Sequence, residues 1–260
     1  MSTQFFRATA LPRDGAIRLF CFPYAGGSGA AIYRQWQQHA PRWLQICPVE
    51  LPGRGWLCTE APFRSLPELA AEITSALYAY TDTPCALFGH SMGALIAYEV
   101  ACNLEAAGKK QLRKLIASGA RAPFLARMRP PVSNLPAPEF LAHVRDMNGT
   151  PAEVLADGEL MEALLPVLRA DFSMCEQYRI GRPLLLRAPI TTLAGLEDEE
   201  ITEPDVRAWK QLTSGAFRCL WFPGDHFYIR ENMTSIVNAI SDELSPAAAF
   251  ARLSGGPNVD

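Results

Sequence analysis

Short continuous runs of apolar residues recur along the chain, separated by segments whose apolar residues follow a helical spacing. Such runs, bounded by turn residues, predict buried strands at 17–22, 44–49, 85–88, 112–118, 188–194 and 217–222. The segments that follow them predict helices at 30–39, 67–80, 94–104, 204–212 and 230–244. Strands that alternate with helices at this spacing predict an α/β fold, a mostly parallel sheet with helices on both faces.

The alternation is interrupted between residues 121 and 183. This segment predicts two or three helices, at 138–147, 152–155 and 159–178, and no strand. An insertion of this length exceeds what a connection between strands needs, and lids over active sites are commonly built in this way. We therefore expect one domain over residues 1–260, with a helical lid insertion at about 121–183 and a flexible tail at about 245–260.

A tight turn between the third predicted strand and its helix contains a candidate nucleophile. The turn reads Gly89-His90-Ser91-Met92-Gly93, the G-x-S-x-G pattern in the strand-turn-helix context that it requires. A serine at the tip of such a turn has a strained backbone, and flanking glycines let the strand and the helix approach closely. The hydroxyl of Ser91 is therefore expected to project from the fold at the positive end of the helix dipole.

The loop after the first predicted strand contains a candidate oxyanion donor. It reads Pro23-Tyr-Ala-Gly-Gly-Ser-Gly29 and leads into a helix. In hydrolases with the G-x-S-x-G turn, one backbone N–H of the oxyanion hole comes from such a loop and the other from the residue after the nucleophile, which predicts Ala25 and Met92. A flexible surface loop is the alternative. Ser28 lies in a near miss of the G-x-S-x-G pattern, several residues past its strand, and we interpret it as a loop residue.

A serine nucleophile needs a general base, and the base needs a carboxylate to orient it. Among the four histidines, His226 alone follows a C-terminal strand, as the chain order serine, acid, histidine demands. The acid should come from the loop after the preceding strand, where we favour Asp198 over the glutamates at 197, 199 and 200. Asp225 is the competitor, although its adjacency to His226 disfavours a bond to Nδ1 of that ring. The candidate triad is therefore Ser91, Asp198 and His226.

Composition narrows the classes of partner and cofactor. Hydrophobic residues form 49% of the 260 residues, and a net charge of −3 without a basic block argues against nucleic acid. No apolar run reaches membrane-spanning length, and the N-terminal residues lack a signal-peptide core, so we expect a cytoplasmic protein. The seven cysteines are scattered without a C-x-x-C pair, which favours buried free thiols over disulfides or a zinc site.

Seven stretches between about residues 17 and 244 form a joint pattern: Phe22-Pro-Tyr-Ala-Gly-Gly27, Leu51-Pro-Gly-Arg-Gly55, Gly89-His-Ser-Met-Gly-Ala94 with Tyr98-Glu99, Leu168-Arg-Ala-Asp171, Gly195-x-x-Asp198, Trp209 and Phe222-Pro-Gly-x-His-Phe227. The pattern resembles the type II thioesterases of non-ribosomal peptide or polyketide biosynthesis, a family of stand-alone α/β-hydrolases. The chain departs from that family at 56–57, 199 and 225. The resemblance implies the α/β-hydrolase fold, with Ser91 as nucleophile, His226 as base, Asp198 as acid, and Ala25 and Met92 as oxyanion donors.

The same resemblance implies hydrolysis of an acyl or aminoacyl thioester on the phosphopantetheine arm of an acyl or peptidyl carrier domain, which removes misloaded or stalled groups. The arm belongs to the partner, so we expect no cofactor and no metal, and we expect a monomer. A small-molecule carboxylesterase with the same triad is the alternative, and a catalytically silent binding protein of this fold is a third hypothesis.

Several residues outside the triad have two interpretations each. Arg121, Arg127 and Arg129, at the start of the insertion, either meet an acidic carrier domain or are solvated loop charges. Phe140, Leu141 and Val144 share one face of a predicted helix and either line an acyl channel or pack against the core. Arg54 either contributes to the rim of the site or has a structural role.

Overall fold

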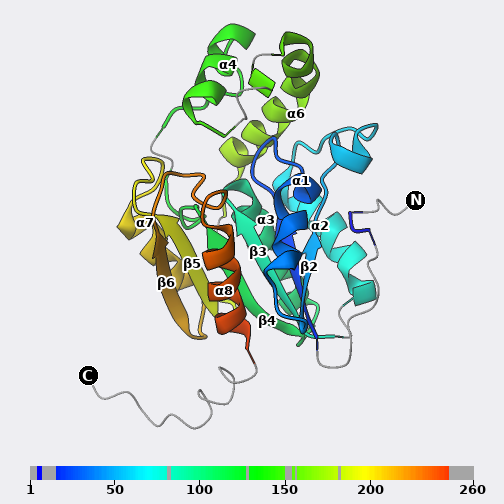
Figure 1. The fold of residues 1–260 in the computed structure, drawn as a ribbon, viewed down its shortest axis with the longest axis vertical. Helices are drawn as coiled ribbons and strands as arrows, with labels where there is room; N and C mark the ends of the chain where they lie inside the picture. The colour runs from blue at the N-terminus through cyan, green and yellow to red at the C-terminus, as the bar shows by residue number, and fades with distance from the viewer. Residues whose placement is uncertain are drawn as a thin grey trace.

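The computed structural model describes residues 5–7, 16–80, 83–126, 129–149, 154–155, 157–180 and 183–245. The strands in this part of the chain form one six-stranded sheet in the order β2-β1-β3-β4-β5-β6, and every described pair is parallel (Figure 1). They are β1 (Ile17–Phe22), β2 (Leu44–Pro48), β3 (Cys85–His90), β4 (Leu112–Ser118), β5 (Ile190–Gly195) and β6 (Phe217–Phe222). The predicted sheet is confirmed, and the tail predicted after residue 245 lies outside the described residues.

The connecting helices follow the predicted positions with two kinds of correction. They are α1 (Gly29–Tyr33), α2 (Leu66–Leu77), α3 (Met92–Ala106), α7 (Glu203–Arg207) and α8 (Met233–Leu244), with 3₁₀ turns η1 (Arg34–Gln38), η2 (Gly55–Leu57), η3 (Tyr78–Tyr80) and η4 (Ala208–Leu212). The helices predicted at 30–39 and 204–212 each tighten from α to 3₁₀ geometry halfway. The predicted start of the last helix at 230 was wrong by three residues.

Side-chain alternation along the strands divides the core between the two faces of the sheet. Leu87 of β3 packs with α2 and α3, whereas its neighbours Ala86 and Phe88 pack with α1, η1 and α8. Successive side chains of a strand point to opposite faces, so continuous apolar runs are what a sheet covered on both sides requires. The carboxyl edge of this sheet stays free to carry the loops that follow β1, β3, β5 and β6.

The start of α3 lies in direct backbone contact with two strands. A Cβ added at Gly93 would lie 2.2 Å from the carbonyl oxygen of Phe22 in β1, and one added at Gly89 would lie 2.0 Å from the carbonyl oxygen of Gly93. Real Cβ atoms do not approach other atoms so closely. The steric reason expected for the two glycines of the turn is therefore confirmed, and the contact brings the loop after β1 beside the start of α3.

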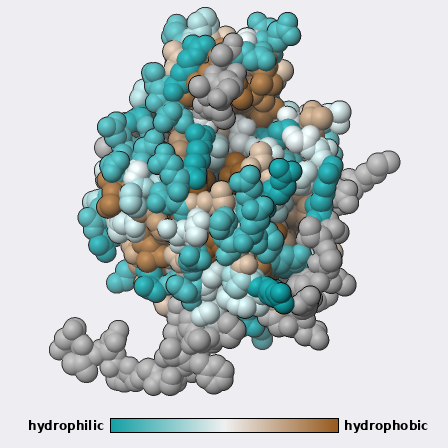
Figure 2. Space-filling view, viewed as in Figure 1, coloured by the Kyte–Doolittle hydropathy of each residue, from teal (hydrophilic) through white to brown (hydrophobic). Residues whose placement is uncertain are grey.

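The segment between β4 and β5, called the insert below (residues 121–183), has helices and no strand among its described residues. It contains α4 (Ala137–Asp146) and α6 (Gly158–Gln177), which stand above the sheet in Figure 1. Half of the helix predicted at 152–155 lies outside the described residues, and its other half, residues 154 and 155, is helical. Phe140, Val144, Met161 and Leu168 form a separate apolar cluster within the insert, and hydrophobic residues are visible there in Figure 2. The insert thus has a small core of its own.

The cysteines agree with the expectation of free thiols. None of the seven forms a disulfide; Cys21, Cys85 and Cys102 are buried, and Cys58 is exposed. Burial raises the pKa of the Cys85 thiol to about 11 and that of Cys102 to about 12. These buried thiols therefore remain protonated and unreactive near neutral pH. No described helix is both long and apolar enough to cross a membrane.

Replacing Gly93 with alanine tests the contact between α3 and β1. The added methyl group would meet backbone rather than a flexible side chain, so we expect a loss of about 2–3 kcal/mol in the free energy of unfolding. Gly158→Ala is the matched control, because a Cβ at that helical position meets nothing within 4 Å; it should be neutral or slightly stabilising. Urea unfolding of both variants measures the difference, and equal stability would contradict the contact.

Candidate active site

Ser91 occupies the turn between β3 and α3 in a strained conformation. Its backbone has φ 54° and ψ −117°, in a region that residues with a side chain rarely adopt. The turn is held by a hydrogen bond of 2.8 Å from the Ser91 N–H to the carbonyl oxygen of Ser118 at the end of β4. Strain that the surrounding backbone holds in place is typical of a functional residue, as the sequence pattern predicts.

His226 lies between Ser91 and Asp198 and is hydrogen-bonded to both. Its Nε2 is 3.1 Å from Ser91 Oγ, and its Nδ1 is 2.8 Å from Asp198 Oδ2. An ionised carboxylate only accepts hydrogen bonds, so Nδ1 carries the proton and the lone pair of Nε2 faces the serine hydroxyl. The side chains of His226 and Asp198 are 8% and 0% exposed, so water does not compete for the bond between them.

The loops after β5 and β6 hold this acid and base in register. The Glu197 N–H donates to the carbonyl oxygen of Gly224 at 3.0 Å, which ties one loop to the other. The second oxygen of Asp198 accepts the Glu200 N–H at 2.8 Å. These bonds fix the carboxylate from both sides, and hydrogen bonds from backbone N–H groups are the usual means of orienting such a group.

Asp225, the competing acid, has other partners. Its Oδ1 accepts the Phe227 N–H at 2.8 Å, and its Oδ2 accepts the side-chain amide of Asn148 at 3.2 Å. Among the acids considered from the sequence, Asp198 is the one whose carboxylate is hydrogen-bonded to His226 in the described structure. The geometry therefore distinguishes the two candidates that the sequence left open.

The two predicted oxyanion donors lie beside Ser91, Ala25 in the loop after β1 and Met92 at the first position of α3. Ala25 lines one cavity together with the serine, and Met92 lines a second cavity that the serine also reaches. Within the described residues, no hydrogen-bond acceptor faces the backbone N–H of Ala25 or of Met92. Backbone donors are rarely left unpaired, and the first N–H groups of a helix have no acceptor inside it. Both groups are thus available to a ligand.

Glu50 holds the loop that carries Ala25, a role that the sequence analysis missed. Its carboxylate is fully buried and accepts hydrogen bonds from Ser28 Oγ at 2.8 Å and from the Gly29 N–H at 3.1 Å. The Ser28 hydroxyl in turn accepts the Ala31 N–H and caps α1. Ser28 is therefore a capping residue rather than a rival nucleophile. An acid directly before Leu51-Pro-Gly-Arg-Gly55 was the only sequence signal for this role.

His90 is a buried residue that packs beside the ring of His226. It is fully buried, its Nδ1 is 2.9 Å from Ser118 Oγ, and that hydroxyl is 2.6 Å from the hydroxyl of Tyr228. The ring centroids of His90 and His226 are 5.2 Å apart. Burial, followed by the charge of His226, lowers the pKa of His90 well below its ordinary value. His90 is therefore neutral near pH 7 and adds no positive charge beside the base.

Two cavities open at Ser91. The smaller has a volume of about 40 Å³, and its walls are mostly apolar side chains that include Val144, Leu168, Phe172 and Phe227. The larger has a volume of about 590 Å³ and extends past His226 to both loop and insert residues. A reacting carbonyl at Ser91 would thus have space on two sides, one apolar and narrow, the other wide and partly polar.

The remaining predicted residues divide between the cavities and the packing of the insert. Arg121 and Arg129 line the larger cavity and pair with Asp205 and Glu200, whereas Arg127 lies outside the described residues. Val144 lines the smaller cavity. Phe140 instead packs inside the insert, 5.2 Å from the ring of Phe172, and Leu141 joins the same apolar cluster.

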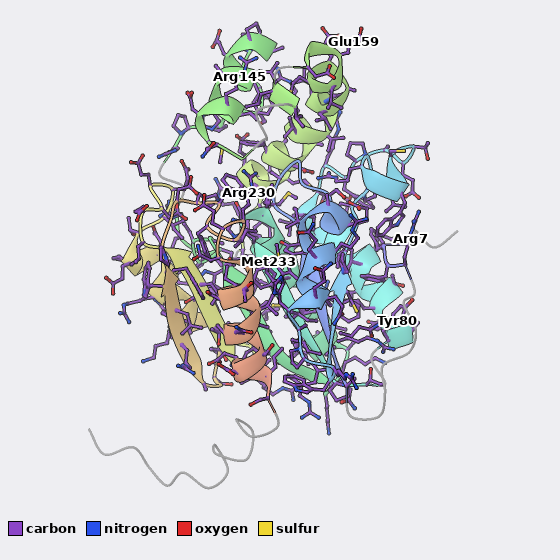
Figure 3. The ribbon with its side chains drawn as sticks, viewed as in Figure 1. Arg7, Tyr80, Arg145, Glu159, Arg230 and Met233 are labelled. Carbon is purple, nitrogen blue, oxygen red and sulfur yellow. The ribbon has the colours of Figure 1, made fainter. Side chains whose placement is uncertain are left out.

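Arg230 connects the insert to the residues around His226. Figure 3 labels it where the insert meets the α/β body. Its guanidinium donates to the carbonyl oxygens of Asn148, at 3.1 Å, and Gly149, and to the Tyr24 hydroxyl at 3.2 Å. It also lies over the ring of Phe227, 4.7 Å from the centroid. The segment after α4 is therefore tied directly to the neighbourhood of the base.

Replacing His90 with glutamine should reduce the loss of stability on acidification. Because the folded pKa of His90 lies below its ordinary 6.5, the unfolded chain binds the extra proton as the pH falls through that value. One such group lowers the free energy of unfolding by up to about 1.4 kcal/mol per pH unit. Urea unfolding from about pH 8 to about pH 5 gives the slopes. The exposed His39, changed to glutamine, is the control, and a wild-type slope in His90→Gln would contradict the assignment.

Several known proteins are similar to this chain in sequence and structure. The family model described as "Thioesterase domain" matches residues 17–244. The chain is 37% identical over 234 residues to linear gramicidin dehydrogenase LgrE of Brevibacillus parabrevis, covering 89% of each, and 36% identical over 232 residues to thioesterase PikA5 of Streptomyces venezuelae, covering 89% of this chain and 82% of that one.

Among solved structures, it is similar to the type II thioesterase BorB from the borrelidin biosynthetic cluster, with a TM-score of 0.84, 36% identity, and coverage of 94% of this chain and 99% of that one. RedJ, a thioesterase of the prodiginine pathway in Streptomyces coelicolor, gives a TM-score of 0.80 at 36% identity and covers 94% and 93%. Since the family model spans most of the chain and these relatives align over nearly its whole length, the protein belongs to the thioesterase domain family.

Proposed function

We propose that this protein is a type II thioesterase that hydrolyses acyl or aminoacyl thioesters from the phosphopantetheine arm of carrier domains and so removes misloaded or stalled groups. The observation that carries the proposal is the hydrogen-bonded array of Ser91, His226 and Asp198 at the opening of two cavities. Relatives named as a type II thioesterase of the borrelidin cluster and as thioesterase PikA5 support the choice of substrate.

The reaction follows from the geometry of the array. His226 takes the proton of Ser91 as Oγ attacks the thioester carbonyl, and Asp198 stabilises the imidazolium that forms. The N–H groups of Ala25 and Met92 donate to the oxyanion of the tetrahedral intermediate. His226 then gives its proton to the departing thiol. Water, deprotonated by the same histidine, attacks the acyl-enzyme and releases the carboxylic acid and the free serine.

The insert acts as the lid of this site in our proposal. Its residues Val144 and Leu168 line the smaller cavity, and Cys175 and Tyr178 line the larger one, so both cavities lie between insert and body. Covering an acyl-enzyme excludes bulk water and strengthens the hydrogen bonds to the oxyanion. We further propose that one copy of the chain suffices, since all three residues of the array belong to the same chain.

Carrier domains supply the thioester and its arm. Arg121 and Arg129 lie on the larger cavity and remain the proposed contacts for an acidic carrier, although each is already paired with a carboxylate of this chain. Pairs of this kind at a rim affect the rate and salt dependence of association more than its strength. In this scheme the phosphopantetheine arm belongs to the carrier domain, and this chain contributes the triad and the oxyanion donors.

Hydrolysis of loaded carriers by wild type and Ser91→Ala tests the function. The variant lacks the nucleophile and should lose about 10³-fold or more in kcat. Ser235→Ala, an exposed serine of α8, is the control and should retain full activity. Equal rates in wild type and Ser91→Ala would remove the proposal. A strong preference for simple oxygen esters over carrier-bound thioesters would favour a carboxylesterase, and no reaction of Ser91 with a fluorophosphonate would favour a silent binding protein.

Amide substitutions of the two competing acids test the identity of the orienting carboxylate. Asp198→Asn should lower kcat by about 10³–10⁴-fold, because an amide stabilises the wrong tautomer of His226. Asp225→Asn keeps an oxygen for the Phe227 N–H and should change kcat less than about tenfold. Steady-state kinetics on one loaded carrier compare the two variants. A larger loss in Asp225→Asn than in Asp198→Asn would reverse the assignment.

A further inference from the structure

A buried ion pair joins the insert to the α/β body beside the oxyanion loop. Asp171 lies on α6, and Arg54 lies in the loop after β2. The guanidinium donates twice to the carboxylate, from Nη1 to Oδ2 at 2.5 Å and from Nη2 to Oδ1 at 2.8 Å. The side chain of Asp171 is 0% exposed and that of Arg54 is 5% exposed. Two parallel bonds of this kind fix both the distance and the orientation of the two groups.

The same carboxylate also holds the backbone next to Ala25. Asp171 Oδ2 accepts the N–H of Gly26 at 2.7 Å, and Gly26 has φ +75°, a conformation that glycine adopts without strain. The peptide that links Gly26 to Ala25 therefore receives its orientation from a side chain of the insert. Ala25 is the residue whose unpaired N–H is the proposed oxyanion donor, so the contact acts one residue away from the reacting atoms.

Packing reinforces the hydrogen bond. Leu168 lies three residues before Asp171 on the same face of α6, and a Cβ added at Gly26 would lie 2.4 Å from Leu168 Cδ2. Arg54 also donates weakly to the carbonyl oxygens of Gly27, at 3.5 Å, and Pro52, at 3.4 Å. Helix α6 thus contacts the turn in two ways: Leu168 packs against Gly26, and Asp171 of the ion pair binds the Gly26 N–H. The turn has little freedom as long as α6 stays in place.

Stability alone does not explain such a pair. The cost of removing two charges from water offsets much of their attraction, and apolar replacements of buried pairs are often neutral or stabilising. The ion pair fixes a single orientation of the turn, which an apolar contact would not do.

We infer that Asp171, supported by Arg54, is a positioning residue that orients the Ala25 N–H for the oxyanion, so that docking of α6 completes the oxyanion hole. The inference rests on the proposed hydrolase function. It assigns the C-terminal half of α6 to the catalytic framework rather than to a freely moving cover. Loss of the contact should weaken binding of the transition state and leave binding of the substrate unchanged.

The decisive variant removes both charges together, because removing one leaves the other buried and unpaired. Arg54→Met/Asp171→Val also deletes the acceptor for the Gly26 N–H. We expect kcat to fall by about 10²-fold, the range for loss of one oxyanion donor. The binding constant for a loaded carrier, measured in a Ser91→Ala background, should change by less than about threefold. Active sites are counted by fluorophosphonate titration, so that loss of folded protein does not count as loss of kcat.

A second readout follows the oxyanion directly. A trifluoromethyl ketone thioether adds to Ser91 as a tetrahedral adduct whose oxyanion occupies the hole, so its inhibition constant should rise by the same factor as kcat falls. A purely structural pair would lower the melting temperature and leave both quantities unchanged per active site. Parallel losses in carrier binding and kcat would likewise overturn the inference.

The rescue variant restores the acceptor without the charges. In Arg54→Met/Asp171→Asn, the amide oxygen accepts the Gly26 N–H again, and we expect at least about tenfold of the lost kcat to return. Equal kcat in the two double variants would overturn the inference. If either double variant fails to fold, Asp171→Glu replaces it: the charge for Arg54 is kept and the carboxylate is displaced from Gly26, so kcat should fall about tenfold with carrier binding unchanged. Unchanged kcat in Asp171→Glu would overturn the inference.

Controls separate this inference from the proposed function. The exposed pair Glu203 and Arg207 on α7, changed to Glu203→Gln/Arg207→Gln, should leave kcat unchanged. If the wild type hydrolyses p-nitrophenyl esters and not carrier thioesters, the proposed function fails, while the same variants compared on the ester still decide the role of Asp171. If the wild type hydrolyses thioesters and the pair variants keep their kcat, the positioning role fails alone.

Discussion

The backbone contact between α3 and β1 is the constraint on which the site depends. Gly93 touches the carbonyl oxygen of Phe22 closely enough that no side chain would fit. The strained turn at Ser91 lies directly before this contact, which brings the loop after β1 next to the nucleophile. The proposed oxyanion donors Ala25 and Met92 therefore both lie beside the attacking hydroxyl of Ser91, although they are far apart in the chain.

The order of the strands in the sheet brings the acid and the base of the array together. β5 and β6 are adjacent and parallel, so the loops at their carboxyl ends lie side by side, and the bond from Glu197 to Gly224 joins them. Asp198 and His226 lie in these two loops. In the sheet, β4 lies between their strands and β3, which precedes Ser91. The rule that ligands bind beyond the carboxyl ends of parallel strands is obeyed here because each functional group leaves its strand at that edge.

Much of this was visible in the sequence because it depends on local pattern. β1, β4 and β6 have the predicted bounds, since continuous apolar runs identify strands that are covered on both faces. β5 starts two residues late, at Ile190, because Pro189 has no N–H for the ladder. Likewise α8 starts at Met233 because the residues after His226 form turns, including the bond from the Tyr228 N–H to the Asp225 carbonyl oxygen.

The parts that could not be read from the sequence depend on contacts between distant segments. Gly26 and Asp171 are 145 positions apart, and nothing in the periodicity of either segment indicates that they meet. Their meeting has a consequence for how substitutions in the insert act. The helix that lines the cavities beside the serine also binds the peptide next to the proposed oxyanion donor. A substitution that displaces α6 would therefore change the shape of the cavities and the orientation of that donor together.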